Sequence, residues 1–136
     1  MRNNIYLEER LQYIWGKYFS DVVKKNPIEI HFGKKARKRL GSIRERKCNG
    51  VSDTLIVING HFKNPEIPEN VIDATIAHEL CHYAHGFGSS LPQLSKYPHR
   101  GGSVDREMER RGLGESLELE KNWLDKNWIK FLRHHH

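Results

Sequence analysis

The stretch PENVIDATIAHELCHYA, residues 68–84, decides how the rest of the chain can fold. Its apolar residues recur at helical intervals but cover most of the circumference, which predicts a central helix that is packed on both sides. Pro68 suits a first helical position, and the acidic side chain of Glu69 complements the positive end of the helix dipole. We therefore expect a helix from Pro68 to about Ala84, with the other elements arranged around it.

An H-E-x-x-H pattern lies inside this predicted helix, formed by His78, Glu79 and His82. Positions i and i+4 share a helical face and are about 6 Å apart along the axis, so both imidazoles can converge on one cation. Glu79 lies at the edge of that face, where it can hold and deprotonate a water molecule but is poorly placed as a ligand. Such a short pattern also occurs by chance in unrelated proteins. Packing alone, however, does not explain three polar side chains on a buried helix, and we interpret them as the site of a metal-dependent peptidase.

A third metal ligand must come from elsewhere, because a catalytic zinc ion takes three protein ligands and leaves one position for water. His85 lies on the same helical stripe, but it is a turn further along the axis and should miss the ion. Glu107 could supply a carboxylate. His99 is the better candidate, because the loop before it is rich in Gly, Ser and Pro and can return this side chain to the metal.

The flanking sequence predicts a small α+β domain. Apolar residues at three- and four-residue intervals indicate an amphipathic helix from about Ile5 to Lys24, which Asn26-Pro27 should end. Alternating or β-branched segments predict three strands, at residues 28–32, 39–46 and 54–59. An Asn-Gly turn signal between the last two favours an antiparallel hairpin.

Two further helices are expected toward the end of the chain. One begins near Val104, and an amphipathic packing helix follows Gly112. The fold class is therefore α+β, with an antiparallel or mixed sheet of about three strands packed on the H-E-x-x-H helix. N-terminal and C-terminal helices support this arrangement.

Length and composition set the broad class. The 136 residues suit one domain, which we assign to residues 1–133, and we interpret His134, His135 and His136 as the remnant of a purification tag. Two cysteines are too few for a disulfide framework and favour a reducing compartment. Without a long apolar run, the chain should be a cytoplasmic or nucleoid-associated monomer that has no membrane contact.

The net charge of +6 is unevenly distributed. Residues 1–66 hold 14 Lys and Arg against 7 Asp and Glu, whereas the remaining residues hold 9 against 10. Such an excess could contact nucleic-acid phosphates, although it equally suits a solvated surface. The excess is concentrated in Lys34, Lys35, Arg37, Lys38, Arg39, Arg44, Arg46 and Lys47.

Residues 39–112 contain a predicted strand beginning Leu40-Gly41-Ser42-Ile43, a strand ending Ile58-Asn59, a Pro-containing lead-in, the HELCH helix, and Pro98-His99-Arg100-Gly101 before a helix with Met108. In these features the segment resembles the SprT-like zinc metallopeptidases, a family that includes the Spartan proteases, which degrade proteins crosslinked to DNA. The resemblance implies a zincin-like fold without the zinc ribbon of the bacterial members.

In that family, the two motif histidines and a histidine of a downstream His-Gly segment hold the zinc. Carried over, this implies one catalytic Zn²⁺ on His78, His82 and His99, with Glu79 as general base. Arg100 separates His99 from Gly101, which is a departure from the family pattern. The implied activity is cleavage of protein or peptide substrates, including proteins bound to DNA.

Two alternatives to a peptidase are open. The basic run also suits a nucleic-acid-binding module whose zinc is structural and which cleaves no peptide. A metal-dependent nuclease of the bacterial rRNA-processing type is less favoured, because those enzymes space their histidines differently and lack the motif glutamate.

Overall fold

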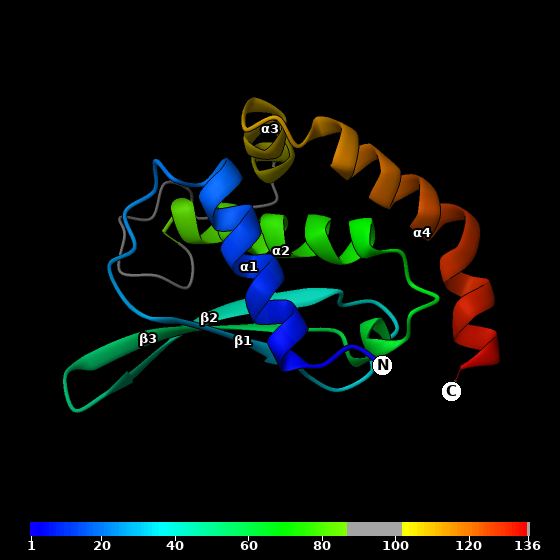
Figure 1. Cartoon of the computed structure of the whole chain (residues 1–136), viewed down its shortest axis with the longest axis horizontal. Coiled ribbons are helices and arrows are strands. Elements are labelled where there is room, and N and C mark those ends of the chain that lie inside the picture. The colour runs from blue at the N-terminus through cyan, green and yellow to red at the C-terminus, as the bar shows by residue number, and fades with distance from the viewer. Residues whose placement is uncertain (87–101, 136) are drawn as a thin grey trace.

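The computed structural model describes residues 1–86 and 102–135. In this part of the chain the α+β class is confirmed. The elements are α1 (Asn4–Tyr18), β1 (Ile28–Phe32), β2 (Gly41–Cys48), β3 (Val51–Ile58), the 3-10 helix η1 (Gly60–Lys63), α2 (Glu69–Ala84), α3 (Ser103–Arg110) and α4 (Gly114–His134). Helix α2 lies over the sheet, with α3 and α4 on its far side (Figure 1).

The sheet has three strands in the order β1-β3-β2, and it is mixed. Strands β1 and β3 are parallel, whereas β2 and β3 form the expected antiparallel hairpin. Asn49 and Gly50 both have positive φ, of 52° and 78°, as the tight turn of a two-residue hairpin requires. Pairing therefore continues to the turn, so β2 reaches Cys48 and β3 begins at Val51, both beyond the predicted limits of these strands.

Helix α1 is shorter than predicted, because it ends at Tyr18 and not near Lys24. Phe19 caps the helix and is fully buried. The guanidinium of Arg111 lies 4.4 Å from the centre of the Phe19 ring and also bonds the carboxylate of Asp21. Contacts with a distant segment therefore determine where the helix stops, and the apolar spacing that continues to Val22 is misleading.

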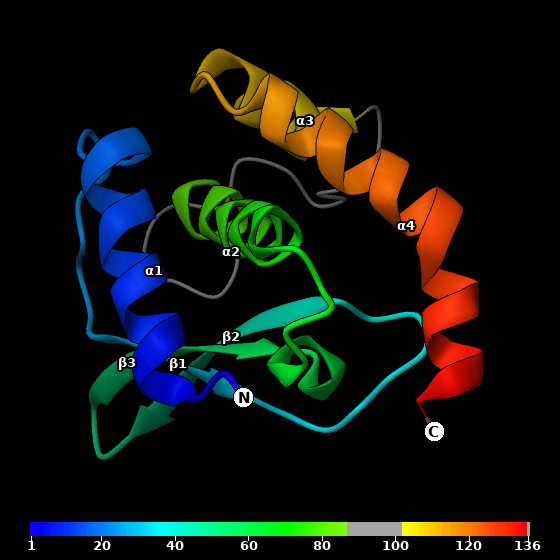
Figure 2. The same ribbon diagram turned by 45° about the vertical axis from the view of Figure 1, so that its right-hand side comes forward.

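Helix α2 is the central buried helix that was expected. It begins at Glu69, with Pro68 as its N-cap, and 11 of its 16 residues are buried. Figure 2 shows α2 between α1 and α4, above the sheet. No helix in the described ranges is long and apolar enough to span a membrane.

Candidate metal centre

His78 and His82 face each other on α2. Their Nε2 atoms are 3.1 Å apart, and their rings meet edge to face at 77°. Two nitrogen ligands on one zinc ion, at about 2.0–2.1 Å and a tetrahedral angle, are about 3.3 Å apart. The i,i+4 spacing thus brings two imidazole nitrogens to the separation that a shared ion requires, and this donor chemistry fits zinc.

Glu79 is buried beside this pair, with 5 % of its surface exposed. Burial raises the pKa of its carboxyl group to about 8; the positive charge of Arg39 opposes this shift, and the carboxylate of Glu120 adds to it. A carboxyl group whose pKa is raised by burial in a cavity is typical of a functional site. A pKa near neutrality also suits a group that must both accept and release a proton.

The first residue of β2 passes directly against this carboxyl group. A Cβ atom on Gly41 would lie 2.9 Å from Cγ2 of Thr75 and 3.2 Å from Oε2 of Glu79. Because Thr75 and Glu79 are on the buried helix, neither can move aside easily. Glycine at position 41 therefore allows the edge strand β2 to approach Glu79 closely.

His78 and Glu79 open onto a cavity of about 470 Å³ between α2, the start of β2, and α4. Its wall also contains Glu120, which is 7 % exposed and accepts a 2.9 Å hydrogen bond from the hydroxyl of Thr75. Burial raises the pKa of Glu120 to about 7. The sequence analysis did not identify Glu120; its signal is an acidic residue at helical spacing from Leu117 within the apolar face of α4. The other lining residues are Lys38, Arg39, Leu40, Gly41, Thr75, Asp105, Leu117 and Lys121.

His85 and Glu107 form a separate pair near the end of α2. His85 Nε2 is 3.0 Å from Glu107 Oε1, and both residues are buried. Glu107 also accepts hydrogen bonds from Arg110 and, at 2.8 Å, from Arg111. Burial raises the pKa of Glu107, but the hydrogen bond with His85 and the charges of Arg111 and Arg110 outweigh it and lower the pKa overall.

No third ligand for the predicted zinc site is found among the described residues. His99, the first choice, lies outside them. Glu107, the alternative, is held by His85 and two arginines. In residues 1–86 and 102–135, no three His, Cys, Asp or Glu side chains are grouped so that they could share a metal ion.

The side chains of the basic run lie in several different environments. Lys38 and Arg39 line the cavity beside Glu79. Lys34, Arg39 and Arg44 border a second hollow of about 490 Å³. Arg46 instead pairs with Asp53 and Glu29, both at 2.7 Å. Like Arg46, the side chains of Lys35, Arg37 and Lys47 line neither hollow.

The loop that carries much of this run is held by buried Asn59. Its side-chain amide donates 2.8 Å hydrogen bonds to the carbonyls of Ala36 and Arg39. The indole of Trp128 on α4 donates another, of 2.7 Å, to the carbonyl of Arg37. The backbone of the basic loop is therefore fixed against the sheet and α4.

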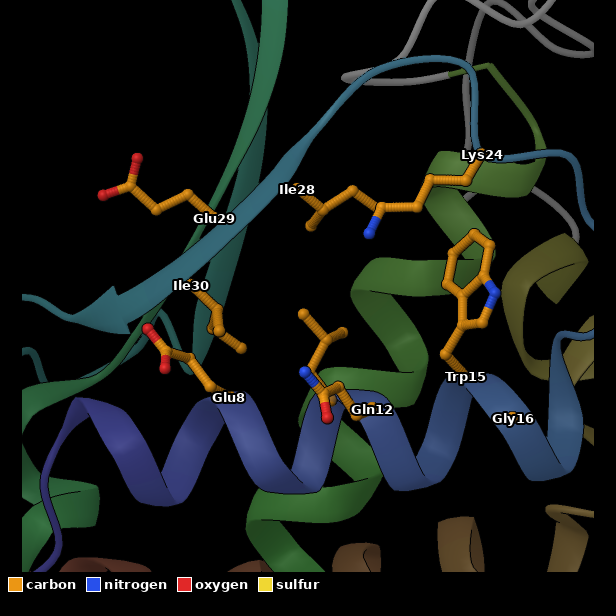
Figure 3. Close-up of a pocket in the computed structure, with 9 residues that line it drawn as sticks. Glu8, Gln12, Trp15, Gly16, Lys24, Ile28, Glu29 and Ile30 are labelled. Carbon is orange, nitrogen blue, oxygen red and sulfur yellow. The ribbon is translucent and has the colours of Figure 1, made fainter.

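A further hollow, of about 390 Å³, lies between α1 and β1. Figure 3 shows Gln12 and Trp15 pointing from α1 towards β1, and Ile28 and Ile30 pointing back. Among the described residues, its lining contains no His or Cys and has only Glu8, Glu29 and Lys24 as charged groups. The cavity beside His78 and Glu79, by contrast, combines an imidazole with a buried carboxyl group.

No family model, curated protein or solved structure matches this chain. The functional argument accordingly rests on the residues and geometry described above.

Proposed function

We propose that this protein is a zinc-dependent endopeptidase with a zincin-like active site of the SprT-like kind. The observation that carries the proposal is the pair of Nε2 atoms of His78 and His82, which are 3.1 Å apart on a buried helix. The buried carboxyl group of Glu79 adjoins them and opens onto the same cavity as His78. A structural role would require neither the convergent nitrogens nor an acid beside them.

His78 and His82 would hold the ion, and we propose His99 as the third ligand. When bound, zinc supplies a positive charge that lowers the pKa of water and polarises a carbonyl oxygen. Glu79 accepts a proton from the attacking water and delivers it to the amine that leaves. Burial favours this proton transfer, because the raised pKa of Glu79 makes the protonated carboxyl group accessible near neutral pH.

Strand β2 is an edge strand of the described sheet, and we propose that it binds the substrate. An extended peptide that paired with β2 would pass Gly41, whose backbone lies against Glu79. Main-chain pairing holds the peptide backbone whatever its side chains are. A peptide bound in this way would present a scissile bond to Glu79.

Cleavage of casein by wild type and by Glu79→Gln tests the proposal. The zinc-loaded wild type should cleave casein, and Glu79→Gln should be slower by about 10²- to 10⁴-fold, the usual contribution of general acid–base catalysis. Elemental analysis should find equal zinc in both proteins, since Glu79 is not assigned as a ligand. No cleavage by the zinc-loaded wild type, or equal cleavage by both, would refute the endopeptidase assignment.

A nucleic-acid-binding module is the second candidate, and the hollow bordered by Lys34, Arg39 and Arg44 favours it. It predicts binding of single-stranded DNA that weakens steeply with salt and is unchanged in Glu79→Gln. Arg44→Ala should weaken binding, whereas Arg46→Ala is the matched control because Arg46 is already paired with two acids. Binding together with casein cleavage would instead favour a peptidase that acts on proteins bound to DNA.

A further inference from the structure

The cavity of about 470 Å³ extends from Glu79 to α4. A substrate that presents a reacting carbonyl group to Glu79 would place one of its neighbouring groups in this cavity. The inner wall combines apolar side chains, Leu40 and Leu117, with the acid Glu120. The cavity is thus suited to a long side chain that has an apolar stem and a polar end.

Glu120 is an unusual group to find in that wall. It is 7 % exposed, and no ion pair joins it to any residue in the described ranges. Its neighbour Lys121 bonds the carboxylate of Asp105 at 2.9 Å. The side chains of Lys38 and Arg39 are exposed at the rim. A buried carboxylate with one neutral hydrogen-bond donor is costly, and an apolar residue at this position would pack without that cost.

We infer that this cavity takes a guanidinium or ammonium side chain of the substrate, with Glu120 as the group that recognises it. A carboxylate can accept two parallel hydrogen bonds from a guanidinium, which gives both affinity and orientation. The apolar stem of an arginine or lysine would contact Leu40 and Leu117. The preference for an arginine or lysine substrate rests on the proposed peptidase function. Binding of a cation by Glu120 does not depend on that function.

Binding of n-butylguanidine, measured by NMR titration, tests the cation site without any need for cleavage. The wild type should bind this probe, and Glu120→Gln should bind it about ten- to a hundredfold more weakly, as expected for loss of a hydrogen bond to a charged group. The amide in this variant would keep an oxygen for the Thr75 hydroxyl, so the fold should persist, and thermal unfolding checks this. Glu118→Gln, which removes the same charge from the exposed face of α4, should bind like wild type. Absence of binding to wild type, or equal binding by Glu120→Gln, would overturn the inference.

A pair of peptides that differ only in arginine or norleucine next to the scissile bond tests the substrate preference. The wild type should show a higher kcat/KM for the arginine peptide, and Glu120→Gln should lose most of that preference while it still cleaves the norleucine peptide. Retention of the full preference by Glu120→Gln would contradict the assignment. If neither peptide is cleaved while n-butylguanidine binds through Glu120, the endopeptidase assignment fails and the cation site stands.

Discussion

Helix α2 and its C-cap carry histidines in two contrasting environments. His78 and His82 face each other, with Nε2 atoms 3.1 Å apart, beside an acid whose pKa is raised by burial. His85, at the C-cap, bonds Glu107, which also accepts hydrogen bonds from two arginines. The two nitrogens of the first arrangement are at the separation that one zinc ion requires, whereas His85 is bonded to a carboxylate that two arginines also hold. Histidine content alone therefore does not mark a metal site; the partners of each ring distinguish the two.

The largest expected effect is on zinc affinity, which should depend on His82 but not on His85. In structural sites with four protein ligands, zinc binding of about 10–16 kcal/mol assigns roughly 2.5–4 kcal/mol to each ligand. On that scale His82→Ala should weaken zinc binding by about a hundred- to a thousandfold, whereas His85→Ala should leave it nearly unchanged. Competition with a chromophoric chelator measures both affinities. Equal losses in the two variants would remove the distinction.

The region of His85 and Glu107 should matter more for the stability of the fold than for zinc binding. Glu107→Gln leaves the partly buried guanidinium of Arg111 without its full counter-charge, and we expect it to lower the free energy of unfolding by about 3 kcal/mol. Its zinc affinity should match that of wild type. Urea denaturation in the presence of a chelator measures the stability. Lys121→Gln breaks an exposed ion pair with Asp105 and, as the control, should change stability by less than about 1 kcal/mol.

The carboxyl groups of the two regions should respond to pH in opposite directions. The pKa of Glu120 is raised to about 7 from 4.5. Protonation of this carboxyl group therefore contributes fully to the free energy of unfolding below about pH 4.5, and this contribution is lost as the pH rises through 7. The pKa of Glu107 is lowered, so its contribution is present above its usual pKa and is lost as the pH falls.

Unfolding in urea with chelator, at pH 5 and pH 8, tests this contrast. Glu120→Gln should be more stable than wild type by about 3 kcal/mol at pH 8, the equivalent of the shift from 4.5 to about 7. At pH 5 the difference should fall to about 1 kcal/mol or less, because Glu120 is then neutral in the folded protein and only partly ionised in the unfolded chain. A difference that does not depend on pH would contradict the assigned ionisation.

The smallest expected effect tests how closely β2 must approach the base. Gly41→Ala places a methyl group against Thr75 and Glu79, which should destabilise the fold by about 1–3 kcal/mol and lower casein cleavage more than zinc content. In Gly16→Ala, by contrast, the new methyl group meets no atom within 4 Å, and helix propensity should stabilise that variant by about 0.5–1 kcal/mol. If Gly41→Ala behaves like Gly16→Ala, the close approach does not constrain the site.

Local patterns predict the elements whose signals are contained in short segments. The buried helix, the Asn49-Gly50 hairpin and the strand at residues 28–32 are found where the sequence predicts them. The end of α1 is not, because Phe19 and Asp21 contact Arg111, about 90 residues away. Tertiary contacts of that kind leave no local signature.

The same division applies to the candidate site. Spacing on a helix predicts the convergence of His78 and His82, since i and i+4 lie on one face. It does not predict that Glu120 on α4 reaches the cavity beside Glu79, or that Gly41 is held against Thr75. These depend on how α4 and β2 pack on α2, which the sequence of each element does not specify.

Zinc content tests the central claim most directly. Elemental analysis should find one zinc per chain in wild type, and one fewer in the His78→Ala/His82→Ala double variant. Because both proteins retain His134, His135 and His136, the difference excludes zinc held by these terminal histidines. Equal zinc in the two proteins, or no stoichiometric zinc in wild type, would contradict the account.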